Sequence, residues 1–373
     1  MIDFIKVVIY NKKLINRFFN HSLLIWSSQH EKLVGEEGVI LSKKCFNYNG
    51  IEFLFSKNKL EILFRPHYYF NSNLHNANDF SIADCIAVIK EFQDTFSIDL
   101  RQFRIVNLEF GLNILSPIDV KDLITWIKYH GRNEFRTHTG LSYSKISSSM
   151  RADGKDNTYK MIKAYAKSLQ HPNYCQGEVF RFEVKSKRYA YIKKLGITSL
   201  EGLLNPQNYD GLIDELKREF KEVLIVDHNL DYSDLSVRDQ KLLAKYLNSD
   251  KWFTYLNQAR NGFRKHFNIY HELLGKCDTH LKKQLTALIN DKCEELKIAE
   301  PVYTIQSIER GANSSISIGE YCTHHEDTEP EDNSYQEINK SSNNRISNYL
   351  LKLQDKINHN LIDLFKIKYE TKE

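Results

Sequence analysis

Two neighbouring segments indicate the fold class: Gly50-Ile51-Glu52-Phe53-Leu54-Phe55-Ser56 and, after Lys57-Asn58, Lys59-Leu60-Glu61-Ile62-Leu63-Phe64. Both segments mix polar–apolar alternation with short apolar runs, which is typical of β-strands. The short Lys57-Asn58 link between them favours a tight turn. The sequence therefore predicts a β-hairpin near the start of the chain.

The segments on either side of this hairpin alternate between strand and helix patterns. Helical patterns cover Asp79 to Phe96, which Asp79 or Ser81 can cap, and Asp119 to Tyr129. Strand patterns cover Ile2–Tyr10, Phe103–Ile114, Leu141–Ser148, Tyr159–Lys167 and Glu178–Lys187. This order predicts an α+β fold, in which a mainly antiparallel sheet carries helices on one face.

The pattern changes after about Arg188, where apolar residues recur mostly at helical spacing. The helical segments are Leu200–Leu204, Gly211–Val223, Leu235–Leu247, Trp252–Gly275 and Leu281–Lys297. We therefore expect a sheet-based domain over residues 1–198 and a mostly helical accessory region over 199–300. Residues 301–345, rich in Ser, Asn and acids, are expected to form a disordered linker, and 346–373 a short amphipathic helix.

Charge is distributed unevenly along the 373 residues, although the formal net charge is only +4. Residues 132–194 contain fourteen Lys and Arg against five Asp and Glu, an excess of nine positive charges. Such an excess is typical of a solvated surface or of a surface that binds a polyanion. Residues 311–345 show the reverse, with seven acids against two bases.

The six cysteines form no CxxC pair, which favours reduced thiols in a cytoplasmic protein. The start, Met1-Ile2-Asp3-Phe4, carries an acid where a signal peptide has basic residues. No uninterrupted apolar run approaches the ~20 residues that span a bilayer. We therefore expect a cytoplasmic protein without a membrane partner. We interpret Cys322-Thr323-His324-His325 as incidental, because it lies in the segment expected to be disordered.

Three short segments place charged or reactive groups within strand patterns. They are Asn107-Leu108-Glu109-Phe110-Gly111-Leu112, Lys163-Ala164-Tyr165-Ala166-Lys167 and Phe180-Arg181-Phe182-Glu183-Val184-Lys185. Alternate residues of a strand share a face, so Lys163, Tyr165 and Lys167 should point the same way. Arg181, Glu183 and Lys185 should do likewise.

These residue types suit chemistry on a phosphodiester. Carboxylates on a sheet face are costly to desolvate unless they are paired or bind a metal. If Glu109 and Glu183 converge, they could hold Mg²⁺ or Mn²⁺, which prefer oxygen ligands and polarise phosphodiesters. A tyrosine can be a covalent nucleophile, and the lysines that flank Tyr165 would favour its phenolate, whose ordinary pKa is about 10. The product would be a 5′-phosphotyrosyl bond.

Each of these signals also has a structural interpretation. Glu109 and Glu183 could be ion-pair partners within the fold, Glu183 for instance with Arg104 or Arg181. Tyr165 is one of 21 tyrosines, so a packing role is open. Alternating lysines are typical of a solvated sheet face. The residues alone therefore lead to a basic α+β protein that could bind phosphate.

At these residues the chain resembles the gene II replication initiators of filamentous phages. The matching segments are Met1-Ile2-Asp3, Gly50-Ile51-Glu52-Phe53, Ala164-Tyr165-Ala166-Lys167, Arg181-Phe182-Glu183 and Tyr191-Ile192-Lys193-Lys194-Leu195-Gly196. The likeness covers roughly residues 1–270 and is weaker between these segments. The tyrosine and Arg-Phe-Glu segments also resemble plasmid rolling-circle initiators that carry a Tyr-x-Lys and Arg-x-Glu arrangement.

The resemblance implies a rolling-circle replication initiator, a metal-dependent endonuclease that nicks an origin and later religates the displaced strand. Tyr165 would be the nucleophile, Lys167 a second catalytic residue, and Glu109 and Glu183 the ligands of Mg²⁺ or Mn²⁺. The family usually has Arg-x-Asp where this chain has Asn107 and Glu109. A His-apolar-His metal motif is also missing from the sequence, and His138 is a candidate third ligand.

The implied partner is DNA, namely a double-strand origin that is locally single-stranded where the tyrosine attacks. A host helicase and polymerase are further expected partners. Phosphate anchors could come from the basic residues Lys160, Lys163, Arg181, Lys185, Lys187, Arg188, Lys193 and Lys194.

Two alternatives remain at this point. One is an origin-binding replication or regulatory protein without nuclease activity, which the Asn107 departure favours. The other is a basic protein whose matches are coincidental, although three blocks in the right order argue against it. The catalytic hypothesis requires Tyr165, Glu109 and Glu183 to converge on one face of the sheet.

Overall fold

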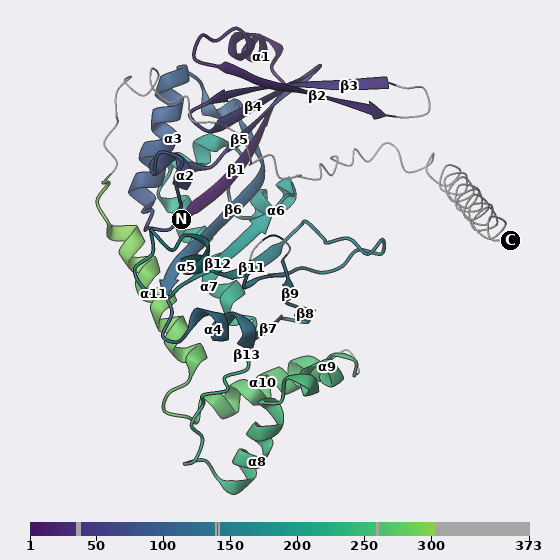
Figure 1. Ribbon diagram of the computed structural model, residues 1–373, viewed down its shortest axis with the longest axis vertical. Helices are drawn as coiled ribbons and strands as arrows, with labels where there is room; N and C mark the ends of the chain where they lie inside the picture. Colours follow the sequence, from purple (N-terminus) through teal and green to yellow (C-terminus); the bar gives the residue numbers. More distant parts are fainter. Residues whose placement is uncertain (35–38, 139, 141, 259–260, 303–373) are drawn as a thin grey trace, which may run out of the picture. The chain divides into compact units, whose positions relative to one another are not determined.

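The computed structural model describes residues 1–34, 39–138, 140, 142–258 and 261–302 (Figure 1). All of them belong to the compact unit Met1–Ala312, the first of two units in the chain. Nearly all of the expected linker, 301–345, and the whole of the expected helix, 346–373, lie outside the described residues. The boundary expected after residue 198 stays a prediction.

A ten-stranded sheet dominates this unit (Figure 1). The strands lie in the order β2-β3-β4-β5-β1-β6-β12-β11-β10-β9, and neighbouring strands are antiparallel. Their bounds are β1 Ile2–Ile9, β2 Ile25–Val34, β3 Val39–Tyr48, β4 Ile51–Ser56, β5 Lys59–Phe64, β6 Arg104–Leu115, β9 Arg136–Thr137, β10 Ser144–Ser147, β11 Met161–Ala166 and β12 Val179–Ser186. The predicted α+β fold with a mainly antiparallel sheet is confirmed, and β4 and β5 form the predicted hairpin.

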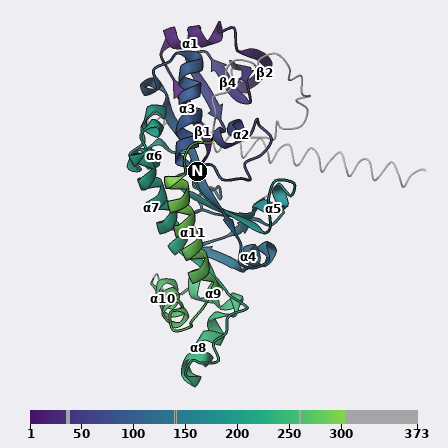
Figure 2. The same cartoon turned by 90° about the vertical axis from the view of Figure 1, so that its left-hand side faces the viewer.

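Three long helices, α3, α7 and α11, pack on one face of this sheet (Figure 2). Ring centroids lie 6.5 Å apart between Phe92 of α3 and Phe53 of β4, and 5.3 Å apart between Phe220 of α7 and Phe182 of β12. The helices are α1 Lys12–Phe19, α2 Pro66–Phe70, α3 Ile82–Phe96, α4 Val120–Trp126, α5 Lys167–Gln170, α6 Tyr189–Lys194, α7 Gln207–Lys221, α8 Val237–Tyr246, α9 Ser249–Leu256, α10 Gly262–Leu274 and α11 Leu281–Ile298. As predicted, Ser81 caps α3, and its side chain accepts from the backbone amide of Asp84.

Alternation along the central strands gives the sheet two chemically different faces. Leu108, Phe110 and Leu112 of β6 are buried in the core beneath the helices, where each such side chain stabilises the fold by roughly 1.5–3 kcal/mol. The residues between them point to the opposite side. We call that side the polar face, and it comprises Lys6 of β1, Glu61 of β5, Asn107, Glu109, Gly111 and Asn113 of β6, Lys163 and Tyr165 of β11, and Arg181, Glu183 and Lys185 of β12.

The helix predicted over Asp119–Tyr129 is too long. Asp119 caps α4, and its side chain accepts from the backbone amides of Lys121 and Asp122, but the helix ends at Trp126. Residues Ile127–His130 instead form strand β7, which pairs with β8 (Asn133–Glu134) and with β13 (Val223–Ile225) in a separate three-stranded sheet. An apolar run that is buried in a strand cannot be told from a helical one by spacing alone.

The region after β13 is helical, as predicted, and has its own hydrophobic core. Trp252 lies at its centre, and its indole nitrogen donates to the carbonyl oxygen of Tyr246 at 2.8 Å. The single pattern predicted over Trp252–Gly275 contains two helices, α9 and α10, because the first ends at Leu256 and the second begins at Gly262. None of the described helices is both long and apolar enough to cross a bilayer.

Candidate functional site

Tyr165, Glu183 and Glu109 come together on the polar face. In the pairing of β11, β12 and β6, Lys163 lies opposite Glu183, which lies opposite Gly111. The Tyr165 hydroxyl donates to Glu183 Oε1 at 2.7 Å. The convergence that the catalytic hypothesis requires is therefore present, while the chemical roles of these residues stay predictions.

Arg181 holds the Glu183 carboxylate in place from the same strand. Its Nε donates to Glu183 Oε1 at 2.6 Å, and a terminal nitrogen lies 3.0 Å from Asp3 Oδ2. Only 2% of Arg181 is exposed, so in this fold its guanidinium is not available at the surface to anchor DNA phosphates. The structural interpretation of Glu183 as a partner of Arg181 is thus correct, whereas Arg104 stacks over Tyr189 instead.

Lys163 lies between the two carboxylates that were expected to share a metal. Its Nζ is 2.9 Å from Glu109 Oε2 and 3.4 Å from Glu183 Oε2, and Lys185 Nζ is 2.5 Å from Glu109 Oε1. Burial opposes ionisation of Glu109, but Lys163 and Lys185 outweigh it and lower the pKa to about 2. Burial also disfavours the Lys163 ammonium, but Glu109 and Glu183 raise its pKa above the ordinary value.

In this arrangement a lysine side chain lies where a divalent ion was expected. The Lys163 ammonium already provides the positive charge between Glu109 and Glu183. His138 follows β9, and its backbone amide donates to the carbonyl oxygen of Ser144 at 2.8 Å. Its ring contributes to a lowered pKa of the Asp156 carboxyl group. Within the described ranges, no group of three or more His, Cys, Asp and Glu side chains is arranged to hold a metal. An ion shared by the two glutamates would have to displace Lys163.

Lys167 is fully buried beside Tyr165 and has an unusual pKa, but it begins helix α5 and does not belong to strand β11 as predicted. Its Nζ donates to Asn76 Oδ1 and, at 2.9 Å, to Gln170 Oε1, and it lies 5.4 Å from the centre of the Tyr165 ring. Burial, and then repulsion from Arg181, lower its pKa to about 7. Burial and the Glu183 carboxylate raise the pKa of Tyr165 well above 10, so the expectation that the flanking lysines favour its phenolate is wrong for this arrangement. A proton donor that titrates near neutrality therefore lies next to a phenol that holds its proton tightly.

Asp3, Asn76 and Asn113 also belong to this site, although sequence reasoning did not select them. Asn76 Nδ2 donates to both carboxylate oxygens of Asp3 at 3.0 Å, and Asn113 Oδ1 accepts from Arg181 at 2.7 Å. Burial opposes the charge of Asp3, but Arg181 outweighs it and holds the pKa well below the ordinary value. A polar residue at a buried alternate position of β6 was the available signal for Asn113.

Gly111 was quoted in the sequence pattern but not selected, and it sets the distance between β6 and Glu183. A Cβ at this position would lie 2.4 Å from the carbonyl oxygen of Phe182 and 2.7 Å from Glu183 Cγ. Neither distance is compatible with a side chain. The absence of one lets the Glu183 side chain lie flat against β6.

A loop anchored on β6 covers the Tyr165 end of the polar face. Asn113 Nδ2 lies 3.2, 3.0 and 3.0 Å from the carbonyl oxygens of Asn76, Ala77 and Asn78. Only 6% of Tyr165 is exposed. The phenol is therefore buried at the end of the polar face where this loop is held.

Lysines exceed glutamates along the polar face and its rim. Glu61 is surrounded by Lys6, Lys43 and Lys59 at 3.1, 3.4 and 3.2 Å. Lys187 lies near the same charges, and burial, followed by repulsion from Lys185, lowers its pKa. Among the lysines and glutamates, the lysines are in excess by three positive charges. The six lysines are Lys6, Lys43, Lys59, Lys163, Lys185 and Lys187, and the three glutamates are Glu61, Glu109 and Glu183.

The remaining predicted DNA anchors lie elsewhere. Lys193 and Lys194 are exposed on α6, and Arg188 is half-buried just before it. Lys160 Nζ lies 2.6 Å from Glu219 of α7, away from the polar face. The structure thus gathers Lys163, Lys185 and Lys187 with Tyr165 but not the other four surface bases.

Comparison with known proteins gives one weak structural match. No family model matches the chain, and no curated protein matches it. A solved structure described as a rolling circle replication initiator protein from Geobacillus stearothermophilus aligns with 73% of this chain and 96% of its own. The two share 7% sequence identity with a TM-score of 0.35, which is too low to support an argument about fold or function.

Proposed function

We propose that this chain initiates rolling-circle replication by nicking one DNA strand at an origin, with Tyr165 as the nucleophile. The observation that carries the proposal is the Tyr165–Glu183 hydrogen bond of 2.7 Å on a sheet face with excess lysine. A nucleophile paired with a base is the arrangement expected for covalent catalysis. The resemblance to filamentous-phage and plasmid initiators points to the same tyrosine.

The excess lysines support a DNA strand as the ligand of the polar face. Lys6, Lys43 and Lys59 are 21–29% exposed in their side chains, and Lys163 and Lys185 are 18% and 12% exposed. Partly exposed ammonium groups of this kind can contact the phosphates of a strand that binds to the polar face. The strand has to be unpaired to place a phosphodiester against Tyr165, so supercoiled DNA or a host helicase would act with the protein. A host polymerase would extend the free 3′ end.

The chemistry can be written with side chains of this chain alone. Glu183 accepts the Tyr165 proton, and the phenolate oxygen forms a bond to phosphorus. The bond from phosphorus to the 3′ oxygen breaks, and Lys167 supplies the proton to that oxygen. The products are a 5′-phosphotyrosyl bond and a 3′-hydroxyl, and the reverse sequence reseals the strand. Arg181 positions Glu183 throughout.

The requirement for Mg²⁺ or Mn²⁺ stays a prediction from the resemblance. A divalent ion would stabilise charge on the phosphate oxygens. Because it competes with the Lys163 ammonium for Glu109 and Glu183, Lys163→Ala should lower the Mg²⁺ concentration needed for half-maximal nicking. Equal nicking by wild type in EDTA and in Mg²⁺ would show that no such ion is used.

A second candidate function is origin binding without cleavage. It is favoured by the 6% exposure of Tyr165 and by the complete pairing of Glu183 with Arg181 and Lys163. Both features would also be expected of a rigid, purely structural network. This candidate predicts that DNA is retained without a nick and that Tyr165→Phe changes nothing.

A nicking assay separates the two candidates. Wild type, Tyr165→Phe and the matched control Tyr143→Phe would be incubated with Mg²⁺ or Mn²⁺ and a supercoiled plasmid that carries the DNA surrounding the gene. Tyr143 is 44% exposed in a turn and has no place in the proposed chemistry. Open circles from wild type and Tyr143→Phe, but not from Tyr165→Phe, are expected. Specific DNA binding without open circles in any of the three proteins would contradict the nickase.

A further inference from the structure

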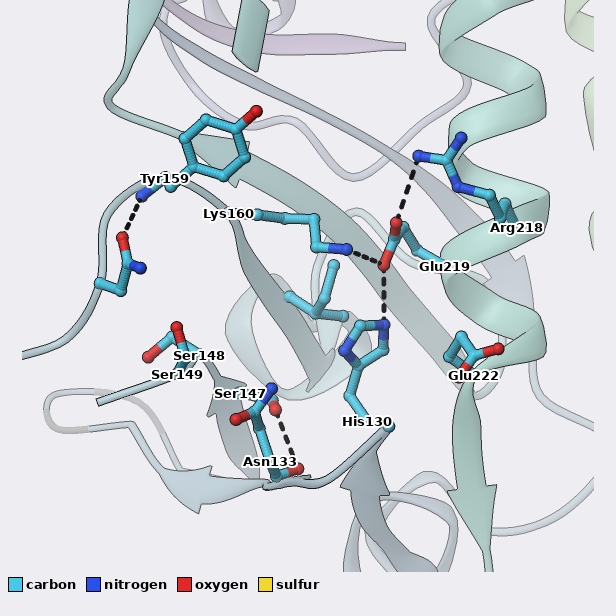
Figure 3. A pocket seen from close by; sticks show the side chains of 13 residues that line it. His130, Asn133, Ser147, Ser148, Ser149, Tyr159, Lys160, Arg218, Glu219 and Glu222 are labelled. Atoms are coloured by element: carbon cyan, nitrogen blue, oxygen red, sulfur yellow. Dashed lines mark hydrogen bonds and ion pairs between the residues drawn. The ribbon is translucent and has the colours of Figure 1, made fainter. Parts of the chain in front are cut away.

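A polar pocket of about 460 Å³ (Figure 3) is lined by Ile162 of β11, whose side chain points to the opposite side of the sheet from Tyr165. It is bounded by β7 and β8, the β10–β11 pair, and α7. Ile162, which lines it, is three residues before Tyr165 in β11, roughly 10 Å along the strand and on the opposite face. Strands β10 and β9 form this edge of the ten-stranded sheet, so the pocket lies near the edge.

The centre of the pocket is a buried carboxylate with a fixed set of partners. Figure 3 shows Lys160 and His130 pointing toward Glu219, and their nitrogens lie 2.6 and 2.9 Å from its Oε2. The side chain of Glu219 is only 3% exposed. Its Oε1 is 3.5 Å from Arg218, which is longer than a good hydrogen bond. Oε1 can therefore accept a further hydrogen bond from a ligand.

The charges of the lining argue for a ligand without net charge. Lys160 and Arg218 are balanced by Glu219 and Glu222, which leaves zero with histidine counted as neutral. The rest of the polar lining consists of hydroxyl and amide groups, namely Asn133, Ser147, Ser148, Ser149, Asn157 and Tyr159. A phosphate would meet two carboxylates here, whereas a neutral group with donors and acceptors meets complementary partners at each side.

Two side chains are suited to hold a flat ring. Tyr159 is 41% exposed, and an edge contact with Tyr191, with centroids 5.3 Å apart, fixes its ring at the rim of the pocket. Aromatic side chains of this kind stack on unpaired bases. Across the pocket, the side-chain amide of Asn133 makes no hydrogen bond to any residue in the described part of the chain. Its NH₂ group can donate a hydrogen bond to a ligand, and its oxygen can accept one.

We propose that this pocket binds one unpaired nucleobase of the DNA strand, with preference for a base that carries an exocyclic amino group. The amino group donates to Glu219 Oε1, the Asn133 amide bonds the rest of the polar edge, and Tyr159 stacks on the ring. The inference rests on the proposed function, because it takes the strand that Tyr165 cleaves as the source of the base.

The test measures binding of the full chain to single-stranded 12-mers of dA, dC and dT and to an abasic 12-mer, by fluorescence anisotropy. Wild type should bind dA or dC roughly 10- to 100-fold more tightly than dT or the abasic strand, the range expected for one hydrogen bond to a charged carboxylate. Asn133→Ala should reduce that preference and leave the affinity for the abasic strand unchanged. Ser149→Ala, at an exposed lining position, provides a second variant that does not threaten folding.

Asn16→Ala, at an exposed position of α1, is the matched control and should behave as wild type. Equal binding of all four strands by wild type would overturn the pocket while leaving a DNA-binding protein. So would a uniform loss of affinity in Asn133→Ala that includes the abasic strand. Failure of wild type to bind any of the strands would sink the proposed function, and this inference with it.

Discussion

Substitution of Gly111 by alanine tests whether the close approach of β6 to Glu183 organises the site. A methyl group there would lie 2.4 Å from the carbonyl oxygen of Phe182, which is 1.0 Å inside the 3.4 Å at which ordinary contact begins. It would also lie 2.7 Å from Glu183 Cγ. Backbone on a paired strand cannot retreat freely, so the strands have to separate or Glu183 has to move. Overpacking of this kind costs about 1–3 kcal/mol.

The assay is urea unfolding of wild type, Gly111→Ala and the control Gly211→Ala, combined with nicking. Gly211 lies in α7 with its nearest potential contact at 3.6 Å, so alanine fits there and should stabilise the helix by roughly 0.5–1 kcal/mol. Gly111→Ala should lower the unfolding midpoint and the nicking rate together. Wild-type stability and wild-type nicking in Gly111→Ala would refute the argument that this glycine sets the position of Glu183.

Three further perturbations give expected outcomes. The pKa of Lys167 is about 7 in the folded protein against an ordinary 10.5, so the unfolded chain binds more protons between these pH values. Wild type should therefore gain stability relative to Lys167→Met as the pH rises from about 7 to about 10.5. Urea midpoints of the two proteins that change in parallel with pH would contradict this. Asn113→Ala removes the hydrogen bonds to the carbonyl groups of the loop and to Arg181. It should lower the free energy of unfolding by about 1–3 kcal/mol and speed proteolytic cleavage within residues 71–80. Cleavage at the wild-type rate would show that Asn113 does not anchor the loop. Lys187→Ala should weaken binding of single-stranded DNA and reduce the slope of log K against log salt concentration by about 0.7. The control Lys12→Ala, at an exposed position, should keep the wild-type slope. An unchanged slope for Lys187→Ala would show that this lysine does not contact the DNA.

The sheet could be predicted because its strands carry a period of two. Leu108, Phe110 and Leu112 fill the core, and the alternate positions carry polar groups. The same period of two places Glu109 on the polar face and puts Tyr165 on the same face as Lys163. Neighbouring strands align residues of one face, so Glu183 lies there too. Local sequence therefore suffices for the strands of the site and for the face on which Glu109, Tyr165 and Glu183 lie.

The partners of these side chains could not be predicted from local sequence. Asp3 reaches Arg181 from a strand more than 170 positions earlier in the chain, and Asn76 reaches Lys167 from a loop. The ammonium between Glu109 and Glu183 depends on the register of three strands, which no single segment specifies. The hairpin of β2 and β3 and helix α1 were not predicted, because their mixed polar and apolar residues gave no clear period.

The most direct test of the central claim is to identify the residue that becomes linked to DNA. Wild type would be incubated with single-stranded oligonucleotides that span the nick found in the plasmid, digested with trypsin, and analysed by mass spectrometry. A 5′-phosphorylated nucleotide is expected on the peptide that contains Tyr165, and it should be absent in Tyr165→Phe. A nucleotide on a different tyrosine, or cleavage that leaves no protein–DNA adduct, would contradict it.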